Sequence, residues 1–403
     1  MKIVAINTFN IGSTGKIMLG IADEARAEGM RYACFYPKSR DNSKKIVTDG
    51  HFIGNRISRN IHLKMQQLFG FRWFYSRGAT KKLIKKLKKI NPDIIHLHNI
   101  HGWYLNVPML FDYIKKYDKK VVWTLHDCWS FTGHCPYFAI TNCRKWVDGC
   151  YECPSYNLYP ESHFDDSKRM YALKRKCFIG VKHMTIVTPS KWLSGLVKKS
   201  FLNLYPVKVI NNGIDVNIFK PRKSEFRSEY KIASDKYIVL GVAFGWGERK
   251  GLDIFVKLAQ RLSGKYQIVL VGTNDTIDKE LPKNIISIHR TNNQSELSEI
   301  YSAADVFVNP TREDNYPTVN MESISCGTPV ITFKTGGSPE MLDEKTGIVV
   351  ECDDIDALQR GIEEICEKKV FSSEDCVGES CKFDQKIKFK EYIELYKEIN
   401  GSE

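Results

Sequence analysis

Two carboxylates in the C-terminal half, Asp314 and Glu322, are separated by seven residues across an expected loop-to-helix turn. A loop residue and a residue about one turn into the following helix can both point into one crevice, where their oxygens accept hydrogen bonds. The start of the helix adds unpaired backbone N–H groups, which bind phosphate. Because Pro317 lacks an N–H, Thr318 and Val319 are the expected phosphate contacts. The segment therefore predicts two carboxylates that face one crevice beside a helix start able to bind phosphate.

A histidine in the N-terminal half follows directly after an expected strand. The apolar run Lys120–Leu125 predicts the strand, and His126 and Asp127 come next. Parallel α/β sheets bind ligands at the carboxyl ends of their strands, so His126 is the candidate functional residue of this half. Asp127 could orient its ring, and a purely structural histidine is the alternative.

The first expected strand is followed by a turn that contains Gly12 and Gly15. The turn superficially suggests a phosphate-binding P-loop, but Asn10 stands where that motif needs glycine. Ile17 likewise stands where it needs Ser or Thr. The P-loop interpretation therefore fails, and Gly15 remains as a candidate contact.

These residues are positioned by alternating strands and helices. In the N-terminal half the expected strands are Lys2–Asn7, Tyr32–Tyr36, Asp93–His98 and Lys120–Leu125. In the C-terminal half they are Tyr237–Val242, Tyr266–Val271, Ile285–His289, Val306–Asn309 and Val330–Phe333. Strands that alternate with helices of ordinary length predict parallel sheets covered on both faces.

The length of 403 residues exceeds one ordinary domain. We expect the boundary near Asn212–Pro221, where Asn-Asn-Gly and Lys-Pro-Arg interrupt the pattern. The expected N-terminal domain covers 1–212, with a Cys-rich insertion at about 128–160, and the C-terminal domain covers 213–383. A final amphipathic helix covers 384–403, and packing back on the N-terminal domain is one option for it.

The segment Asp305–Glu340 closely resembles the nucleotide-binding motif of family 4 retaining glycosyltransferases. The resemblance implies the GT-B fold, in which two Rossmann-like doubly wound α/β domains face each other across a cleft. It also implies that Asp314 bonds to hydroxyl groups of the donor sugar and Glu322 to those of the ribose. The first acid is Asp where the family more often has Glu, which shortens its reach.

Other segments match the same family in the expected order. Gly241–Gly251 resembles the loop whose basic residue grips the donor diphosphate, which implies that role for Lys250. Val242 occupies the place of a second Arg, for which Arg249 is the candidate substitute. The resemblance places His126 beside the donor sugar and Gly15 near the phosphates. It implies transfer without a catalytic metal or cofactor and with retention of anomeric configuration.

The segment Asn99–Gly102, the motif His126–Trp129 and the cysteines are similar to the colanic-acid-like branch that makes capsules and exopolysaccharides. Five of the twelve cysteines fall between Cys128 and Cys153. Four of them form the pattern C-x7-C-x6-C-x2-C, which suits a tetrahedral structural zinc: Cys135, Cys143, Cys150 and Cys153. Free buried thiols and a redox or disulfide role are the alternatives.

The formal net charge is +13, and the excess of Lys and Arg lies in the N-terminal half. In the stretch Arg56–Lys89, cations alternate with Leu68, Phe69, Phe71, Trp73, Phe74 and Tyr75. Apolar anchors beside cations suit contact with an anionic membrane surface, although a solvated basic face is an alternative. No signal peptide or membrane span is evident. We expect a cytoplasmic protein, peripheral at the inner face of the cell membrane.

The resemblance implies transfer of a hexose-type sugar from a UDP- or GDP-sugar to a growing, lipid-linked glycan. A sugar-nucleotide epimerase of the same fold is the first alternative. A basic nucleic-acid-binding protein is the second, but recognition motifs for nucleic acid are missing and the acidic pair would repel a phosphate backbone. We therefore expect no nucleic-acid partner.

Overall fold

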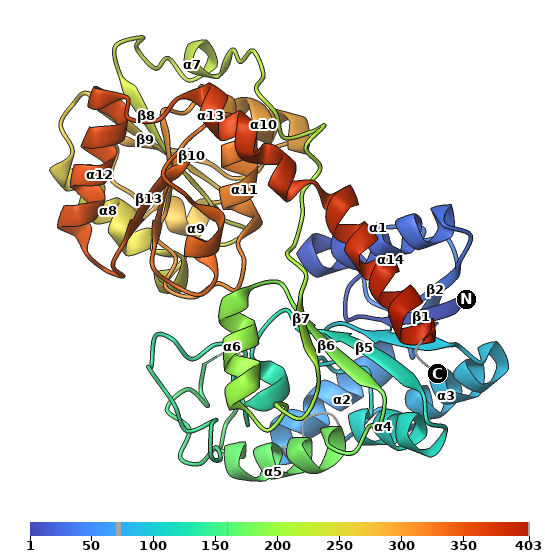
Figure 1. The fold of residues 1–403 in the computed structure, drawn as a ribbon. Coiled ribbons are helices and arrows are strands. Elements are labelled where there is room, and N and C mark those ends of the chain that lie inside the picture. The colour runs from blue at the N-terminus through green and yellow to red at the C-terminus, as the bar shows by residue number, and fades with distance from the viewer. Residues whose placement is uncertain (70–73, 159, 402–403) are drawn as a thin grey trace. The chain divides into compact units, whose positions relative to one another are not determined.

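The computed structural model describes residues 1–69, 74–158 and 160–401, and the side chains of 67–69 are not described. Phe71 and Trp73 therefore lie outside the described residues, as do the side chains of Leu68 and Phe69. The chain divides into two units (Figure 1). Unit 1 combines Met1–Asn211 with Lys388–Glu403, and unit 2 is Asn212–Ile387.

Unit 1 is built on a seven-stranded sheet with the order β3-β2-β1-β4-β5-β6-β7, in which every neighbouring pair is parallel. The strands are β1 Lys2–Ile6, β2 Arg31–Pro37, β3 Gly50–Ile53, β4 Ile94–Leu97, β5 Lys120–Thr124, β6 Met184–Thr188 and β7 Val207–Val209. The central strands are buried on both faces because they consist mainly of apolar residues. The predicted doubly wound parallel sheet is confirmed here.

The helices of unit 1 are α1 Gly12–Ala27, α2 Arg56–Phe69, α3 Arg77–Ile90, α4 Val107–Lys116, α5 Ser167–Phe178 and α6 Lys191–Lys199, with a 3-10 turn, η1, at Trp129–Phe131. Local sequence explains where two of them begin. The Asn106 side chain accepts a hydrogen bond from the Met109 amide at the start of α4. Ser190 caps α6 in the same way through the Leu193 amide.

The last helix, α14 Gln385–Gly401, contributes its apolar side to unit 1. Phe389, Tyr392 and Tyr396 belong to the same buried cluster as α1 and β1. A Cβ atom at Gly20 of α1 would lie 2.1 Å from the Phe389 ring, so only glycine permits this approach. Packing of α14 thus completes one face of the unit 1 core.

Unit 2 contains a six-stranded parallel sheet with the order β10-β9-β8-β11-β12-β13. Its strands are β8 Tyr237–Val242, β9 Tyr266–Val271, β10 Ile285–Ile288, β11 Val306–Asn309, β12 Val330–Phe333 and β13 Gly347–Val350. Its helices are α7 Phe226–Glu229, α8 Leu252–Arg261, α9 Asp275–Asp278, α10 Gln294–Ala303, α11 Thr318–Ser325, α12 Ile355–Lys368 and α13 Ser373–Gly378, with 3-10 turns η2 Glu248–Lys250, η3 Ser338–Met341 and η4 Glu379–Phe383. Buried clusters lie against both faces of this sheet, as expected for a Rossmann-like unit.

Candidate active site

The acidic pair of unit 2 lies where strand β11 passes through a loop into helix α11. Arg312 holds this loop in place: its guanidinium bonds to both Asp253 carboxylate oxygens at 2.8 Å. Its Nε also bonds to Asp353 at 2.8 Å. The two carboxylates raise the pKa of Arg312, so it remains a cation. The loop that carries Asp314 is therefore rigidly tied to the start of α8.

Lys250 and Asp314 come together in the structure. The ammonium group lies 2.5 Å from Asp314 Oδ2, and each side chain is 20% exposed. Gly251 follows η2 with a φ of +74°, a conformation that favours glycine. A Cβ at this position would lie 2.4 Å from the Pro310 carbonyl oxygen, so glycine allows η2 to pack closely against the segment that leads to Asp314. Arg249 donates to the Glu313 carbonyl at 3.0 Å. Two candidate cations thus border the loop of the candidate acid.

A second glycine brings the segment after β12 against the same loop. Gly336 has a φ of +55°, and a Cβ there would lie 1.7 Å from the Asp314 carbonyl oxygen. The Gly337 amide donates to the Asn315 carbonyl at 2.9 Å. The backbone around Asp314 is consequently packed from two sides, which fixes the direction of its side chain.

Glu322 lies on α11 and accepts a hydrogen bond from the Tyr301 hydroxyl at 3.2 Å. Burial raises the pKa of Tyr301 well above its ordinary value, so this hydroxyl keeps its proton and donates. Thr318 and Val319 begin the same helix and are half-buried. Pro317 precedes them and supplies no side-chain cap to this helix start, the position at which helices bind anions.

In unit 1, His126 follows the end of β5, and its Nε2 lies 3.1 Å from Nδ1 of His98. The two rings are stacked, with an interplanar angle of 11°. Burial lowers the pKa of His126 to about 4. The ring is therefore neutral near pH 7, so it can donate or accept hydrogen bonds but does not supply a positive charge.

Asp127, expected to orient His126, is engaged with other groups. Its Oδ2 lies 2.9 Å from Nε2 of His101, and its Oδ1 accepts from the Trp129 amide at 2.9 Å. These contacts fix the start of η1. The His126 ring lies within hydrogen-bond distance of His98, a residue that the sequence analysis did not single out.

Gly15 lies in the first turn of α1 and is buried. A Cβ at this position would lie 2.6 Å from the carbonyl carbon of Asn10. Asn10 is itself held by Asn42, whose backbone carbonyl accepts from its side chain at 3.0 Å. Close packing of the turn is therefore sufficient to explain glycine at position 15.

The cysteine-rich loop between η1 and α5 gathers the four predicted metal ligands in one region. The Cys135 thiol hydrogen-bonds to Cys153, which lowers the pKa of Cys153 and raises that of Cys135. The Gly133 amide donates to Cys150 Sγ at 3.1 Å. Across the described ranges, however, no three of the four sulfur atoms lie within 4.8 Å of one another.

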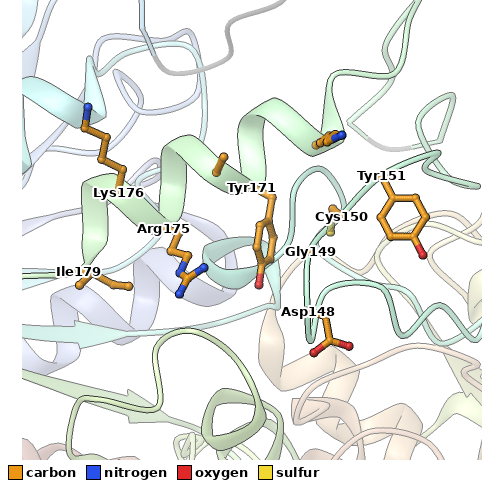
Figure 2. A pocket seen from close by; sticks show the side chains of 10 residues that line it. Asp148, Gly149, Cys150, Tyr151, Tyr171, Arg175, Lys176 and Ile179 are labelled. Carbon is orange, nitrogen blue, oxygen red and sulfur yellow. The ribbon is translucent and has the colours of Figure 1, made fainter.

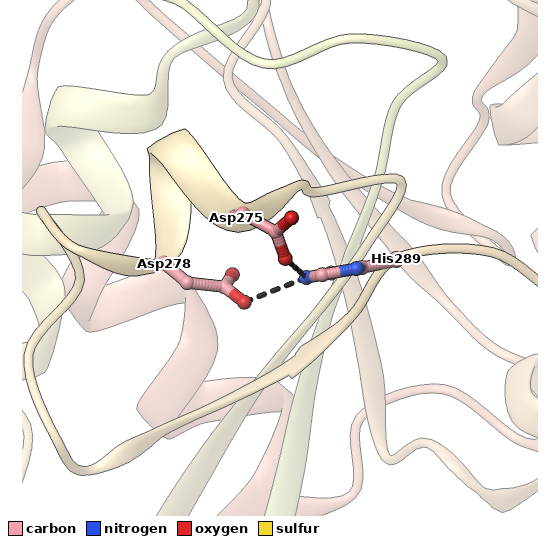
Figure 3. A group of neighbouring side chains, drawn as sticks. All are labelled: Asp275, Asp278 and His289. Atoms are coloured by element: carbon pink, nitrogen blue, oxygen red, sulfur yellow. Dashed lines mark hydrogen bonds and ion pairs between the residues drawn. The ribbon is translucent and has the colours of Figure 1, made fainter.

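The group of potential metal ligands that does meet this spacing within the described residues is Asp275, Asp278 and His289 of unit 2 (Figure 3). All three are exposed. His289 Nε2 lies 2.6 Å from Asp278 and 3.9 Å from Asp275. The hydrogen bond that His289 donates to the Asp278 carboxylate raises the pKa of His289. An ion pair between His289 and Asp278 accounts for this arrangement.

A groove of about 600 Å³ lies between the cysteine-rich loop and α5 (Figure 2). Tyr171 and Arg175 reach into it from α5, while Asp148 and Tyr151 border it from the loop. Of the residues singled out from the sequence, its lining contains only Cys150. The lining of this groove thus contains none of the candidate catalytic residues.

The structure therefore brings Lys250, Asp314 and Arg249 together in unit 2, with Glu322 on the adjoining helix. His126 and Gly15 belong to unit 1. Sequence reasoning missed Arg312 and Tyr301, whose partners lie 59 and 21 positions away along the chain. Within the described ranges, no helix combines the length and apolar character needed to cross a bilayer.

Comparison with known proteins gives two family matches that follow the two units. Residues 15–218 match the model described as Glycosyltransferase Family 4, and residues 236–368 match Glycosyl transferases group 1. The first match covers the His126 segment and the second covers Lys250, Asp314 and Glu322.

Curated relatives agree at low identity. WcaC of Escherichia coli (strain K12), named for colanic acid biosynthesis, is 25% identical over 66% of this chain. The chain spans 65% of the length of WcaC. A 41.2 kDa protein in the cps region of Klebsiella pneumoniae is 24% identical over 78% of this chain and 81% of its own length.

Solved structures share the fold over the whole chain. Sucrose-phosphate synthase from Thermosynechococcus elongatus aligns over 100% of both chains, with a TM-score of 0.74 and 17% identity. Anabaena Alr3699/HepE in complex with UDP aligns over 99% of this chain and 100% of its own, with a TM-score of 0.68 and 15% identity. The predicted GT-B fold class is confirmed by these neighbours. Together with the match over residues 15–218, this shows that the chain belongs to glycosyltransferase family 4.

Proposed function

We propose that the protein transfers a hexose-type sugar from a nucleotide diphosphate sugar to a growing, lipid-linked polysaccharide, with retention of anomeric configuration. The observation that carries the proposal is the Lys250–Asp314 pair beside the uncapped start of α11. A cation, a carboxylate and the amides of a helix start are groups that bind a donor with phosphates and sugar hydroxyls. The relatives named for colanic acid and the cps region support a capsule or exopolysaccharide product.

The ion pair suggests how the donor is accepted. Lys250 exchanges Asp314 for the donor diphosphate, and Asp314 then accepts hydrogen bonds from sugar hydroxyls. Arg249 and the amides of Thr318 and Val319 add to the charge stabilisation of the departing diphosphate. Glu322 takes the ribose hydroxyls. The roles of His126, beside the donor sugar, and of Gly15, near the phosphates, follow the family resemblance.

The transfer step in this proposal needs no catalytic metal. The bond between the anomeric carbon and the diphosphate oxygen breaks, and the acceptor hydroxyl oxygen forms the new bond on the same face. The leaving diphosphate takes the proton of the acceptor hydroxyl. Lys250 stabilises the negative charge that this bond cleavage places on the diphosphate.

A panel of UDP-, GDP- and ADP-sugars tests the donor assignment. We expect slow hydrolysis of one UDP- or GDP-sugar without acceptor, and the released sugar should be the only new carbohydrate. The Anabaena structure in complex with UDP supports a uridine nucleotide. Conversion of one intact nucleotide sugar into another would establish the epimerase instead. Absence of turnover of every donor, with and without a polysaccharide-repeat acceptor, would contradict the proposal.

We also propose that unit 1 associates with an anionic membrane through α2 and α3. Ile57 and Ile61, one turn apart on α2, are 70% and 56% exposed. The exposed lysines of α3 are Lys81, Lys82, Lys85, Lys86, Lys88 and Lys89. Exposed apolar side chains beside cations match an interfacial helix, and each cation near the surface adds about 1 kcal/mol. Such contact would hold the protein at the inner face of the cell membrane.

Co-sedimentation with vesicles should show binding that rises with the fraction of anionic lipid and falls with salt, because the Debye length shrinks to about 3 Å at 1 M. Changing Lys82, Lys85, Lys86 and Lys89 to Gln should reduce this binding strongly. A matched control changes the same number of exposed lysines elsewhere in unit 1: Lys168, Lys182, Lys198 and Lys199. If both variants lose vesicle binding equally, net charge alone explains the binding. If the wild type binds neutral vesicles as well as anionic ones, charge is not the cause.

A structural zinc in the cysteine-rich loop is a further part of the proposal. The Gly133 amide already donates to Cys150, as groups around metal-bound sulfur do, and the shared proton eases ionisation of Cys153. Tetrahedral coordination at Zn–S bonds of about 2.3 Å needs sulfur separations of about 3.8 Å. The four sulfur atoms must therefore move closer together to bind the ion. Binding would then hold the cysteine-rich loop, which forms one side of the groove, in a fixed position.

Metal analysis of protein prepared without chelator should find about one zinc per chain. Changing both Cys135 and Cys153 to Ser should abolish it, whereas Cys177→Ser, which lies on α5 outside the cluster, should not. Brief EDTA treatment that removes magnesium should leave transfer intact. Protein without zinc would exclude the four-thiolate site, and inactivation that magnesium alone reverses would contradict metal-independent transfer.

A further inference from the structure

Three histidines of unit 1 form a column that ends at the half-buried His126, with the buried His98 and His96 behind it. His98 lies between the other two: its ring centroid is 4.0 Å from that of His96, and its Nδ1 is 3.1 Å from Nε2 of His126. His96 and His98 are 0% and 1% exposed. The column follows the neighbouring strands β4 and β5, because His96 pairs with Val122 in their parallel register. Because β4 and β5 are neighbours in the sheet, the three side chains come together near the carboxyl ends of these two strands.

The far end of the column is built by α14. Nδ1 of His96 lies 2.6 Å from the Tyr396 hydroxyl, and Nε2 lies 2.8 Å from Oγ1 of Thr124. Thr124 in turn donates to the Tyr392 hydroxyl at 3.3 Å. Both tyrosines are buried members of the α14 face that packs on unit 1. Hydrogen bonds and ring contacts thus link the last helix to the candidate functional histidine.

The protonation of the column is constrained by burial. Burial lowers the pKa of His96 to about 3 and that of His98 well below its ordinary value, so both rings are neutral near pH 7. A neutral imidazole has one N–H and one lone pair. Either His98 donates from Nδ1 to His126, or His126 donates from Nε2 to His98.

Nε2 of His98 decides between these two arrangements. This atom is buried and has no hydrogen-bond partner. If His126 donated, the proton of His98 would sit on Nε2 as a buried N–H without an acceptor, and such orphaned donors are rarer than unused lone pairs. If His98 donates from Nδ1, only a lone pair is left without a partner. The second arrangement is therefore the favoured one.

We propose that His98 is a positioning residue that fixes the tautomer of His126. With Nε2 of His126 occupied as the acceptor, its proton stays on Nδ1, and the ring presents a neutral N–H donor. On the proposed function, on which this inference rests, that donor bonds to a hydroxyl group of the donor sugar. The Tyr396 hydroxyl of α14 holds the other end of the column in register.

Nitrogen-15 NMR of histidine-labelled protein tests the tautomer without requiring turnover. We expect Nδ1 of His126 to be protonated and Nε2 to be unprotonated, with the signals assigned through His126→Gln. In His98→Leu the two tautomers of His126 should become mixed. In His98→Asn the side-chain amide replaces the Nδ1–H, and the wild-type tautomer should persist. Protonated Nε2 in the wild type would overturn the proposal.

Kinetics separate positioning from simple stability. His98→Leu should lower kcat at least tenfold with little change in the KM for donor, whereas His98→Asn should stay within about threefold of the wild type. Tyr396→Phe should lower kcat by a smaller factor. Its control, Tyr205→Phe, removes a half-buried hydroxyl that donates to the Phe178 carbonyl and should affect only the melting temperature.

The outcomes also distinguish this inference from the proposed function. Unchanged kcat in a folded His98→Leu variant would overturn the positioning role. If the predicted tautomer is found but no nucleotide sugar is turned over, the proposed function fails while the tautomer assignment stands. If turnover is normal and His126→Gln is also fully active, His126 has no role for His98 to support, and the inference fails alone.

Discussion

The Lys250→Met variant should transfer sugar at least about a hundredfold more slowly than the wild type, because removal of one group that stabilises developing negative charge typically costs two to three orders of magnitude. Lys250 is the cation held closest to the candidate acid, and methionine keeps most of its length without the charge. Arg249 bonds to a backbone carbonyl and cannot replace it at the same position. The measurement is kcat at saturating donor and acceptor.

The matched control is Lys257→Met. Lys257 lies on α8, the helix that follows Lys250, and pairs with Asp253 at an exposed position. This variant loses one positive charge in the same region and should keep near wild-type kcat. If both variants lose activity equally, the loss reflects the change in net charge of the region or a folding defect, and not a specific role of Lys250. If Lys250→Met stays within threefold of wild type, the diphosphate role of Lys250 is wrong.

The Glu322→Gln variant should raise the KM for donor about tenfold to a hundredfold, since charge-assisted hydrogen bonds contribute about 1.5–3 kcal/mol and each 1.4 kcal/mol is a factor of ten. Gln still offers an oxygen to the Tyr301 hydroxyl, so the fold should persist. Asp314→Asn should show a comparable loss, with a larger share in kcat because Lys250 is released from its partner.

Isothermal titration with the free nucleoside diphosphate separates the two carboxylates. On the proposed roles, Glu322→Gln removes a contact to the ribose and should weaken nucleotide binding, whereas Asp314→Asn removes a contact to the sugar and should change it less. Glu364→Gln, an exposed carboxylate on α12, is the control and should bind as the wild type does. If both Glu322→Gln and Asp314→Asn keep the wild-type turnover at sub-saturating donor, the assignment of these carboxylates to the donor site is wrong.

Apolar runs were sufficient to predict most of the central strands, such as β8 and β9, because strands buried on both faces consist almost entirely of apolar residues. Four strands were missed: β6, which lies inside the unit 1 sheet, and the edge strands β3, β7 and β13. The sequences of β3 and β13, Gly-His-Phe-Ile and Gly-Ile-Val-Val, are only partly buried and begin with glycine, so they carry little strand signal. Pairing with β2 and β12, which is long-range information, makes them strands.

The acidic pair could be found from sequence because Asp314 and Glu322 belong to one local loop-to-helix unit. The residues that hold them could not. Arg312 meets Asp253 only after the β8 and β11 regions are placed side by side in the sheet. His98 likewise reaches His126 because β4 and β5 are neighbours. Contacts across a fold depend on strand order, which spacing along the chain does not encode.

The membership of α14 in unit 1 has a consequence for biosynthesis. Residues Asn212–Ile387 form a continuous unit that can fold as soon as they leave the ribosome. Unit 1 begins first but lacks Phe389, Tyr392 and Tyr396 until the whole of unit 2 has been synthesised. Until then the face of α1 around Gly20 stays uncovered and in contact with water. Maturation of the first unit therefore waits for the second.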